Sequence, residues 1–208
     1  VYKGHDLDWY RDAPADLSEF GIPRGAFAVG AVANYRPRKG IEVLIQATHH
    51  LPPSAPVHLL LVGAGMDKPK LARLIEESPM RERIHVAGYR SDAAALIAAC
   101  DASVLASIKR EGLPKTVIEA MVHGVPAVVT DTGGSAELVV DGRTGLVVPP
   151  ADAPALARAI QYLCEHPAEA SAMGRLGRDR IDQDFNIRET IRQTLSVYED
   201  ALADRAPD

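Results

Sequence analysis

The first 150 residues alternate short apolar runs with segments of helical periodicity. Six runs have the length of strands, at residues 26–33, 57–62, 84–87, 102–106, 126–130 and 145–148. Five segments between them have helical spacing, at residues 40–51, 68–78, 92–100, 114–123 and 134–140. Continuously apolar strands joined by helices are typical of a parallel sheet that is buried on both faces. We therefore predict an α/β fold, with a doubly wound, parallel, six-stranded Rossmann-like sheet followed by C-terminal helices.

The chain becomes purely helical after Pro149-Pro150, and we expect helices at residues 152–164, 167–183 and 187–203. Five apolar residues line one face of the last helix, namely Ile187, Ile191, Leu195, Tyr198 and Leu202. A stripe of this kind needs a partner surface. The partner is either the sheet of this chain or another domain.

The composition of the chain argues against some classes of function. The formal net charge of −5 argues against a nucleic-acid-binding protein, which usually carries a basic face. Cys100 and Cys164 fall in predicted helices among apolar residues, which favours reduced thiols in the cytosol over a disulfide. The histidine spacing predicts no metal site.

The loops that follow the predicted strands collect the polar and glycine residues of interest. Because the carboxyl ends of parallel strands meet at one edge of a sheet, where ligands bind in such folds, we expect these loops to form one site. The residues brought to that edge are Lys39, Gly63, Arg90, Glu111 and Gly133-Gly134.

The segment from Glu111 to Glu119 combines two carboxylates with a Gly-Leu-Pro turn that opens a helix. Pro114 suits the first helical position, and the exposed amides of the first turn favour a phosphate. Gly112 allows a ligand to approach the backbone, and Glu119 could accept hydrogen bonds from the hydroxyls of a ribose. Two basic clusters, Arg36/Arg38/Lys39 and Lys109/Arg110/Lys115, favour an anion. The segment therefore predicts a bound nucleotide.

Other nucleotide and hydrolase motifs are not matched. Gly63-Ala64-Gly65 follows the second strand, but Lys68 stands where the dinucleotide motif requires a third glycine, so we expect no nicotinamide cofactor. The sequence contains neither a Walker motif nor a Gly-x-Ser-x-Gly elbow. Ser107 and Ser135 are therefore not expected to be hydrolase nucleophiles.

The order and spacing of several motifs resemble the C-terminal, donor-binding domain of the family 4 retaining glycosyltransferases, which have the two-domain GT-B fold. The resemblance runs from about residue 1 to residue 203. The matching blocks are Lys39-Gly40, Val62-Gly63-x-Gly65, Glu111-Gly112-Leu113-Pro114-Lys115, Glu119-Ala120-Met121, His123-Gly124-Val125-Pro126, Thr130-Asp131-Thr132-Gly133-Gly134, Glu137-Leu138-Val139-Val140-Asp141-Gly142 and Thr144-Gly145-Leu146-Val147-Val148-Pro149.

The resemblance implies a role for each matched residue. Lys39 would bind the diphosphate and Glu111 would lie beside the donor sugar, and these two are the implied catalytic residues. Glu119 would hold the ribose hydroxyls. The other implied donor-binding residues are Gly63, Tyr89, Arg90, Gly112, Leu113, Pro114 and Lys115, with the loop at residues 88–90 near the base. Arg38, in the loop with Lys39, is added to them as an expected donor-binding cation.

The implied reaction moves a sugar from a UDP or GDP sugar to a glycan or lipid-linked acceptor, with retention by same-face attack. GT-B enzymes need no bound metal, and Lys39 and the helix end would replace one. The family usually has an arginine five or six residues before the lysine, where this chain has Asn34 and Ala33. Arg36 or Arg38 could supply the missing cation.

The resemblance also divides the chain. Residues 1–20 would be an interdomain crossover, residues 21–185 the donor-binding domain, and residues 186–208 a helix that packs back on an N-terminal acceptor domain. Residues 1–6 resemble the interdomain crossover of the family, so we expect the chain to begin at the domain boundary. Without the acceptor domain we expect it to bind nucleotide weakly and to transfer little or no sugar. The complete enzyme is expected in the cytoplasm, with peripheral attachment to the inner face of the membrane left open.

Two other functions stay open at this point. One is a sugar-nucleotide epimerase or a phosphorylase with the same two-domain plan, although no segment matches the pyridoxal-bearing lysine of a phosphorylase. The other is a non-catalytic sensor or scaffold that binds nucleotide sugars. Turnover by the full-length protein separates an enzyme from a sensor.

Overall fold

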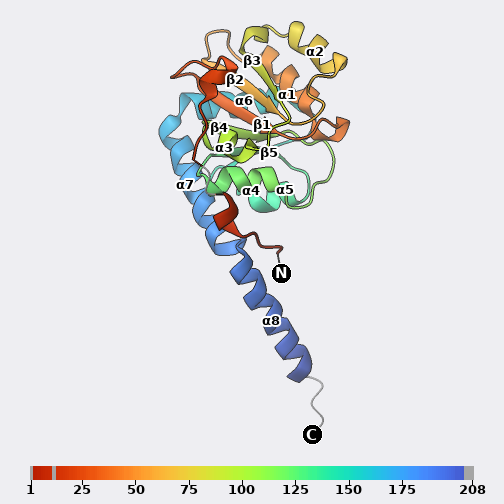
Figure 1. The fold of residues 1–208 in the computed structure, drawn as a ribbon, viewed down its shortest axis with the longest axis vertical. Coiled ribbons are helices and arrows are strands. Elements are labelled where there is room, and N and C mark those ends of the chain that lie inside the picture. The colour runs from red at the N-terminus through yellow and green to blue at the C-terminus, as the bar shows by residue number, and fades with distance from the viewer. Residues whose placement is uncertain (1, 11–12, 204–208) are drawn as a thin grey trace.

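The computed structural model describes residues 2–10 and 13–203. Its six strands form one parallel sheet in the order β3-β2-β1-β4-β5-β6 (Figure 1). The strands are β1 (Phe27–Val32), β2 (Val57–Val62), β3 (Ile84–Gly88), β4 (Ala102–Leu105), β5 (Ala127–Thr130) and β6 (Gly145–Val148). The predicted α/β, doubly wound, six-stranded Rossmann-like fold is confirmed.

Each crossover between strands contains a helix, and three more helices follow the sheet. They are α1 (Ile41–Ala47), α2 (Pro69–Glu76), α3 (Ala93–Ala98), α4 (Lys115–Val122), α5 (Gly134–Leu138), α6 (Ala153–Glu165), α7 (Pro167–Asp184) and α8 (Ile187–Ala203). The expected ranges were one or two residues too long at several ends. The first was four too long, because a 3-10 turn over Thr48–His50 follows α1, with the Thr48 hydroxyl donating to the Ile45 carbonyl at 2.6 Å.

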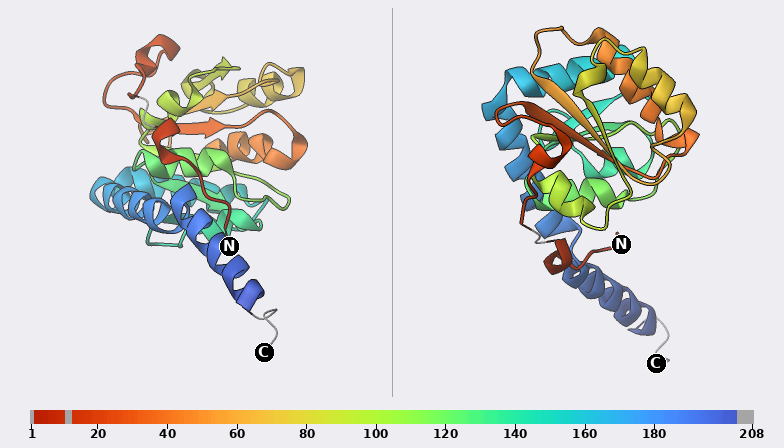
Figure 2. Two further views of the ribbon diagram at one scale, coloured as in Figure 1. Left: turned by 60° about the horizontal axis from the view of Figure 1, so that its bottom comes forward. Right: turned by 45° about the horizontal axis from the view of Figure 1, so that its top comes forward.

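The helices cover both faces of the sheet (Figure 2). Helices α1, α2 and α6 pack together over one face, and α3 and α4 pack over the other. Successive residues of β1 point to opposite sides, since Val29 lies in the core beneath α1 and α6 while Ala28 lies in the core beneath α3. This arrangement explains why the strands are apolar along their whole length.

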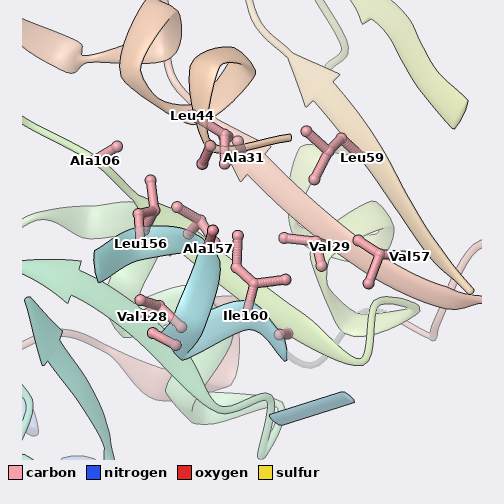
Figure 3. Close-up of a cluster of buried hydrophobic side chains, with 14 of the residues drawn as sticks. Val29, Ala31, Leu44, Val57, Leu59, Ala106, Val128, Leu156, Ala157 and Ile160 are labelled. Carbon is pink, nitrogen blue, oxygen red and sulfur yellow. The ribbon is translucent and has the colours of Figure 1, made fainter. Parts of the chain in front are cut away.

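The larger core lies between α6 and the strands β1, β2 and β5 (Figure 3). Ile160 of α6 points toward Val29 of β1 in this close-up, and both side chains are 0% exposed. Burying such side chains stabilises a domain by about 1.5–3 kcal/mol each. The core therefore fixes β1, which leads to the loop with Lys39.

Helix α8 leaves the domain and extends away from it, beside the N-terminal segment (Figure 1). Its apolar face is exposed, with Ile191 53% and Leu195 55% accessible to solvent. The sheet of this chain therefore does not bury the stripe. The expectation that another domain buries it stays a prediction. No helix within the described ranges is long and apolar enough to cross a membrane.

Candidate functional site

The sheet order reverses between β1 and β4. From β1 the chain builds outward to β2 and β3, and from β4 it builds in the other direction to β5 and β6. The loops after β1 and β4 therefore diverge from neighbouring strand ends, which is where ligands bind in open α/β sheets. Lys39 follows β1 and Glu111 follows β4.

Backbone contacts fasten these two loops together. The Ile108 N–H donates to the Arg38 carbonyl at 2.8 Å. Gly40 has a φ of +65°, and a Cβ there would lie 1.9 Å from the Ala106 carbonyl oxygen. Only glycine fits this close approach. Gly40 thus lets Lys39 lie beside the chain that leads to Glu111.

A third loop, after β5, joins the same rim. The Glu111 N–H donates to the Thr132 carbonyl at 3.3 Å, and the Gly134 N–H donates to the Glu111 carbonyl at 3.1 Å. A Cβ on Gly134 would lie 2.1 Å from the Gly112 carbonyl oxygen. Hydrogen bonds to its N–H and its carbonyl therefore fix the backbone of Glu111, independently of the contacts of its carboxylate.

The Glu111 carboxylate gathers three donors on one oxygen, Oε1. The Ser107 hydroxyl donates at 2.6 Å, Lys39 Nζ at 2.8 Å and Arg38 Nη1 at 3.2 Å. Glu111 is only 9% exposed. Of the two arginines in this loop, Arg38 contacts Glu111, whereas Arg36 precedes the 3-10 turn η3 (Pro37–Lys39) and is exposed.

These contacts set the charge state of Glu111. Burial alone would raise the pKa of this carboxyl, but the hydrogen bonds from Lys39 and Ser107 and the charge of Arg38 outweigh burial and lower the pKa below its ordinary value. Glu111 is therefore an anion at neutral pH. An anionic ligand that approached Lys39 would compete with this carboxylate for the ammonium group.

An open cleft of about 400 Å³ begins at Glu111. Gly112 borders it, and a Cβ on Gly112 would meet no atom within 4 Å, so its backbone faces free space. The residues that line the cleft are Arg110, Glu111, Gly112, Leu113, Gly134 and Glu137. The cleft therefore offers polar side chains and accessible backbone next to the Lys39–Glu111 pair.

The expected position of Pro114 was wrong by one residue. Pro114 has a ψ of 117° and stands before α4, whose first residue is Lys115. A pyrrolidine ring suits this position as well, because its φ of −73° lies within the range that the ring allows. The first amides of α4 still lie at a helix start next to the cleft.

Glu119 is held on α4 by different partners. Lys115 Nζ lies 3.2 Å from Glu119 Oε1, one turn away, and 5.3 Å from the ring centroid of Tyr10. Tyr10 belongs to the 3-10 helix η1 (Leu7–Tyr10) of the N-terminal segment. Lys115 therefore pairs with Glu119, and the pKa of Lys115 is raised chiefly by that charge. Glu119 is not among the residues that line the cleft at Glu111.

Gly63, after β2, approaches the backbone of the loop after β1. A Cβ on Gly63 would lie 2.0 Å from the Ala33 carbonyl oxygen, and the Ala64 N–H donates to Asn34 Oδ1 at 3.0 Å. Close packing of two loops thus explains Gly63. Asn34, which stands near the position of the missing arginine, fastens these loops.

Tyr89 and Arg90, after β3, lie at the edge of the sheet. Tyr89 is 74% exposed. Arg90 donates to Asp92 at 2.7 and 2.8 Å and to Glu19 at 3.3 Å, and its guanidinium lies 5.4 Å from the centroid of the Phe20 ring. In this structure Arg90 is paired with Asp92 and Glu19, whereas the Tyr89 side chain is largely exposed to solvent.

Two residues of the site were not predicted from the sequence. Ser107 was considered only as a nucleophile, yet its hydroxyl is the donor nearest to Glu111, and a polar residue directly after a buried strand was the available signal. Glu137 was seen only as part of a motif, yet it lines the cleft. Among the described residues, no group of three or more His, Cys, Asp or Glu side chains is placed to hold a metal.

The family model described as "Glycosyl transferases group 1" matches residues 26–166, which include every strand and the Lys39–Glu111 pair. The chain belongs to this glycosyltransferase family. Its fold is the α/β Rossmann-like fold found in GT-B glycosyltransferase structures.

Individual relatives are longer than this chain. It is 28% identical over 195 residues to the N-acetyl-alpha-D-glucosaminyl L-malate synthase of Bacillus anthracis, a match that covers 93% of the chain but 51% of the relative. It is 32% identical over 170 residues to the MMP alpha-(1->4)-mannosyltransferase of Mycolicibacterium hassiacum, with coverage of 80% and 41%. This glycosyltransferase chain spans about half the length of the curated relatives it matches.

A solved structure also matches most of this chain and is longer than it. HepE of Anabaena, crystallised with UDP-glucose, superimposes with a TM-score of 0.83 and 29% identity, covering 95% of this chain and 57% of HepE. The match extends over nearly all of this glycosyltransferase chain.

Proposed function

We propose that this chain is the donor-binding half of a retaining glycosyltransferase that moves a hexose from a UDP or GDP sugar to a glycan or a lipid-linked acceptor. The observation that carries the proposal is the 2.8 Å pair between Lys39 Nζ and Glu111 Oε1, at the point where the sheet order reverses. A cation and a carboxylate together at this point suit a ligand that has both a diphosphate and a sugar.

In this proposal Lys39 and Arg38 bind the diphosphate. Breaking the bond between the sugar and the diphosphate builds negative charge on the leaving phosphate. Pre-aimed cations stabilise that charge in the transition state, commonly the largest single contribution to catalysis. The backbone amides from Gly112 to Lys115, at the start of α4, add donors for the phosphate or the sugar.

Glu111 lies beside the donor sugar, and Glu119 accepts hydrogen bonds from the ribose. The acceptor attacks from the face that the nucleotide leaves, which retains the configuration at the anomeric carbon. Tyr89 stacks near the base, with Arg90 and Gly63 on the same side.

The proposed reaction needs no cofactor and no divalent metal, since Lys39, Arg38 and the start of α4 supply positive charge. The acceptor would be bound by an N-terminal domain that packs on the apolar face of α8. We place the complete enzyme in the cytoplasm, where a lipid-linked acceptor would bring it to the membrane.

The test is turnover by the full-length protein with UDP and GDP sugars, with Glu111→Ala and Lys39→Ala as variants. Transfer by the wild type that both variants abolish supports the proposal. Calorimetry with UDP, GDP, ADP and CDP in the presence of a chelator should show binding of UDP or GDP. Equal binding of all four, or of none, would contradict the proposed site.

HepE, crystallised with UDP-glucose, favours a sugar nucleotide over other ligands. The relatives named as synthases and transferases favour an enzyme over a sensor and do not favour an epimerase. A wild-type protein that bound nucleotide but transferred and hydrolysed nothing would reverse that preference.

A further inference from the structure

The Glu111 carboxylate is stabilised as an anion by two cations that the proposed function also assigns to a ligand. Lys39 Nζ lies 2.8 Å and Arg38 Nη1 3.2 Å from Glu111 Oε1, and the Ser107 hydroxyl donates to the same oxygen at 2.6 Å. In the proposed function Lys39 and Arg38 bind the diphosphate of the sugar nucleotide. The carboxylate and the diphosphate therefore compete for the same two cations.

The other elements around Glu111 contribute less charge to it. The loop after β5 makes backbone contacts, through the Thr132 carbonyl and the Gly134 N–H. Two further charged side chains line the cleft within the part of the chain that the structure describes, namely Arg110 beside Glu111 and Glu137 of α5, and both are exposed. These two charges have opposite signs and are screened by solvent. The loop after β1 therefore supplies the cations that keep Glu111 ionised.

Three effects act on Glu111 in the same direction once a diphosphate has bound. The phosphates neutralise Lys39 and Arg38, they bring negative charge close to the carboxylate, and Glu111 stays in a site where it is only 9% exposed. Loss of an opposite charge, gain of a like charge and burial each favour the neutral form of a carboxyl group. The Ser107 hydroxyl suits either form, since it can donate to a carboxylate or accept from a protonated carboxyl.

We propose that Glu111 takes up a proton from the solvent when the chain binds a sugar nucleotide, so that the bound donor lies beside a neutral carboxyl group. The inference rests on the proposed function, because it requires the diphosphate to bind Lys39 and Arg38. A neutral carboxyl can donate as well as accept a hydrogen bond, and it does not repel the leaving diphosphate. Because binding then consumes a proton, the Kd of the sugar nucleotide should fall as the pH is lowered from about 8 to about 6.

Calorimetry with UDP-glucose and GDP-mannose on this chain counts the protons. The binding enthalpy, measured at about pH 6 in two buffers of different ionisation enthalpy, gives the number of protons taken up per ligand. A sugar nucleotide suits this test because the terminal phosphate of UDP or GDP itself titrates at about pH 6, whereas the esterified diphosphate does not. We expect an uptake of about half a proton or more for the wild type and none for Glu111→Gln, whose Kd should not vary with pH.

Glu42 of α1 provides a matched control. Its Oε1 also accepts from two donors, the Tyr35 hydroxyl at 2.7 Å and Lys70 Nζ at 3.2 Å. Glu42→Gln should leave the proton uptake and the Kd of the sugar nucleotide unchanged. Infrared difference spectroscopy on the wild type adds a readout that needs no variant. Ligand binding should produce the carbonyl band of a protonated carboxyl, which distinguishes a glutamate from a histidine.

Three results would overturn the inference. One is that the wild type binds a sugar nucleotide without taking up a proton. Another is that the uptake persists in Glu111→Gln or occurs without the carboxyl band, which would place the proton on another group. In both cases the sugar nucleotide still binds and the proposed function stands. The third is that the wild-type chain binds neither sugar nucleotide, which would remove the proposed function together with the inference.

Discussion

Glu111 and Glu119 stand at the two ends of one nine-residue segment, but different parts of the chain hold them. Glu111 is held by tertiary contacts, because Arg38 and Lys39 come from the loop after β1 and Ser107 lies just after β4. Glu119 pairs with Lys115 one helical turn away and lies beside the N-terminal segment. The position of Glu111 therefore depends on the sheet topology, and that of Glu119 on one helix.

The comparison of Glu111 with Glu119 predicts that the largest effect on activity comes from replacing Lys39. Lys39→Met removes the cation that would face the diphosphate and leaves Glu111 with fewer donors. We expect kcat of the full-length enzyme to fall about a hundredfold to a thousandfold, the usual loss for one pre-aimed group that stabilises transition-state charge. Steady-state kinetics with a nucleotide sugar measures it.

Lys70→Met is the matched control for this loss. Lys70 also pairs with a glutamate, Glu42, at 3.2 Å, but it lies on α2 and is largely exposed. Its removal should leave kcat within about twofold, since exposed pairs contribute 0–1 kcal/mol. Equal losses in both variants would mean that Lys39 acts through general charge or stability.

A smaller effect, on nucleotide affinity, is expected from replacing Glu119, at the other end of the segment from Glu111 to Glu119. Glu119→Gln weakens hydrogen bonds to a ribose, so the Kd of the nucleoside diphosphate should rise about tenfold. The decisive readout is the same measurement with the 2′-deoxy nucleotide, which lacks one of the two hydroxyls. If the variant weakens the ribose and deoxyribose ligands equally, Glu119 does not hold the ribose.

The tertiary contacts of Glu111 also predict a pH dependence. Because the folded-state pKa of Glu111 is lowered, this group adds stability above its unfolded pKa of about 4.3, and that contribution is lost as the pH falls through the folded pKa. In Lys39→Met the folded pKa moves back up, so the free energy of unfolding should fall less steeply between pH 5 and pH 3, a window of about two units around that value.

Urea unfolding at a series of pH values measures this difference. Lys109→Met is the control, since Lys109 is an exposed lysine of the neighbouring loop. The free energy of unfolding of Lys109→Met should change with pH in the same way as that of the wild type. A Lys39→Met profile that also ran parallel would show that the ion pair contributes nothing to folding.

The smallest effect is expected on α8, which the domain does not bury. Leu195→Ser should change the free energy of unfolding of this chain by less than about 0.5 kcal/mol, whereas Ile181→Ala on α7, where Ile181 is 0% exposed, should cost about 3 kcal/mol. In the full-length protein Leu195→Ser should be destabilising if another domain covers the stripe. An unchanged free energy of unfolding in both this chain and the full-length protein would contradict the expectation that another domain covers the stripe.

The fold was predictable from the sequence because strand and helix periods differ clearly. The strands at residues 57–62 and 145–148 were predicted with the bounds that the structure has. The expected strand at residues 26–33 was one residue too long at each end, since an apolar run continues past the last hydrogen-bonded pair of a strand. The turn after α1 depends on the Thr48 hydroxyl, which competes with the helix for a carbonyl.

The site was predictable only in part. The meeting of Lys39 with Glu111 follows from the rule that ligand loops gather at the carboxyl edge of a parallel sheet, given an order in which β1 and β4 are neighbours. Side-chain pairing follows from no such rule. The Ser107 hydroxyl on Glu111 and the ion pair between Arg90 and Glu19 join residues whose spacing carries no signal.

The most direct measurement of the central claim is the contribution of the diphosphate to binding, with and without Lys39. Calorimetry compares uridine with UDP, or guanosine with GDP, in the presence of a chelator, for the wild-type chain and for Lys39→Met. If Lys39 binds the diphosphate, the wild type should prefer the diphosphate strongly and the variant should lose most of that preference. An unchanged preference in Lys39→Met would contradict the account, because the ligand would then lie away from the Lys39–Glu111 pair.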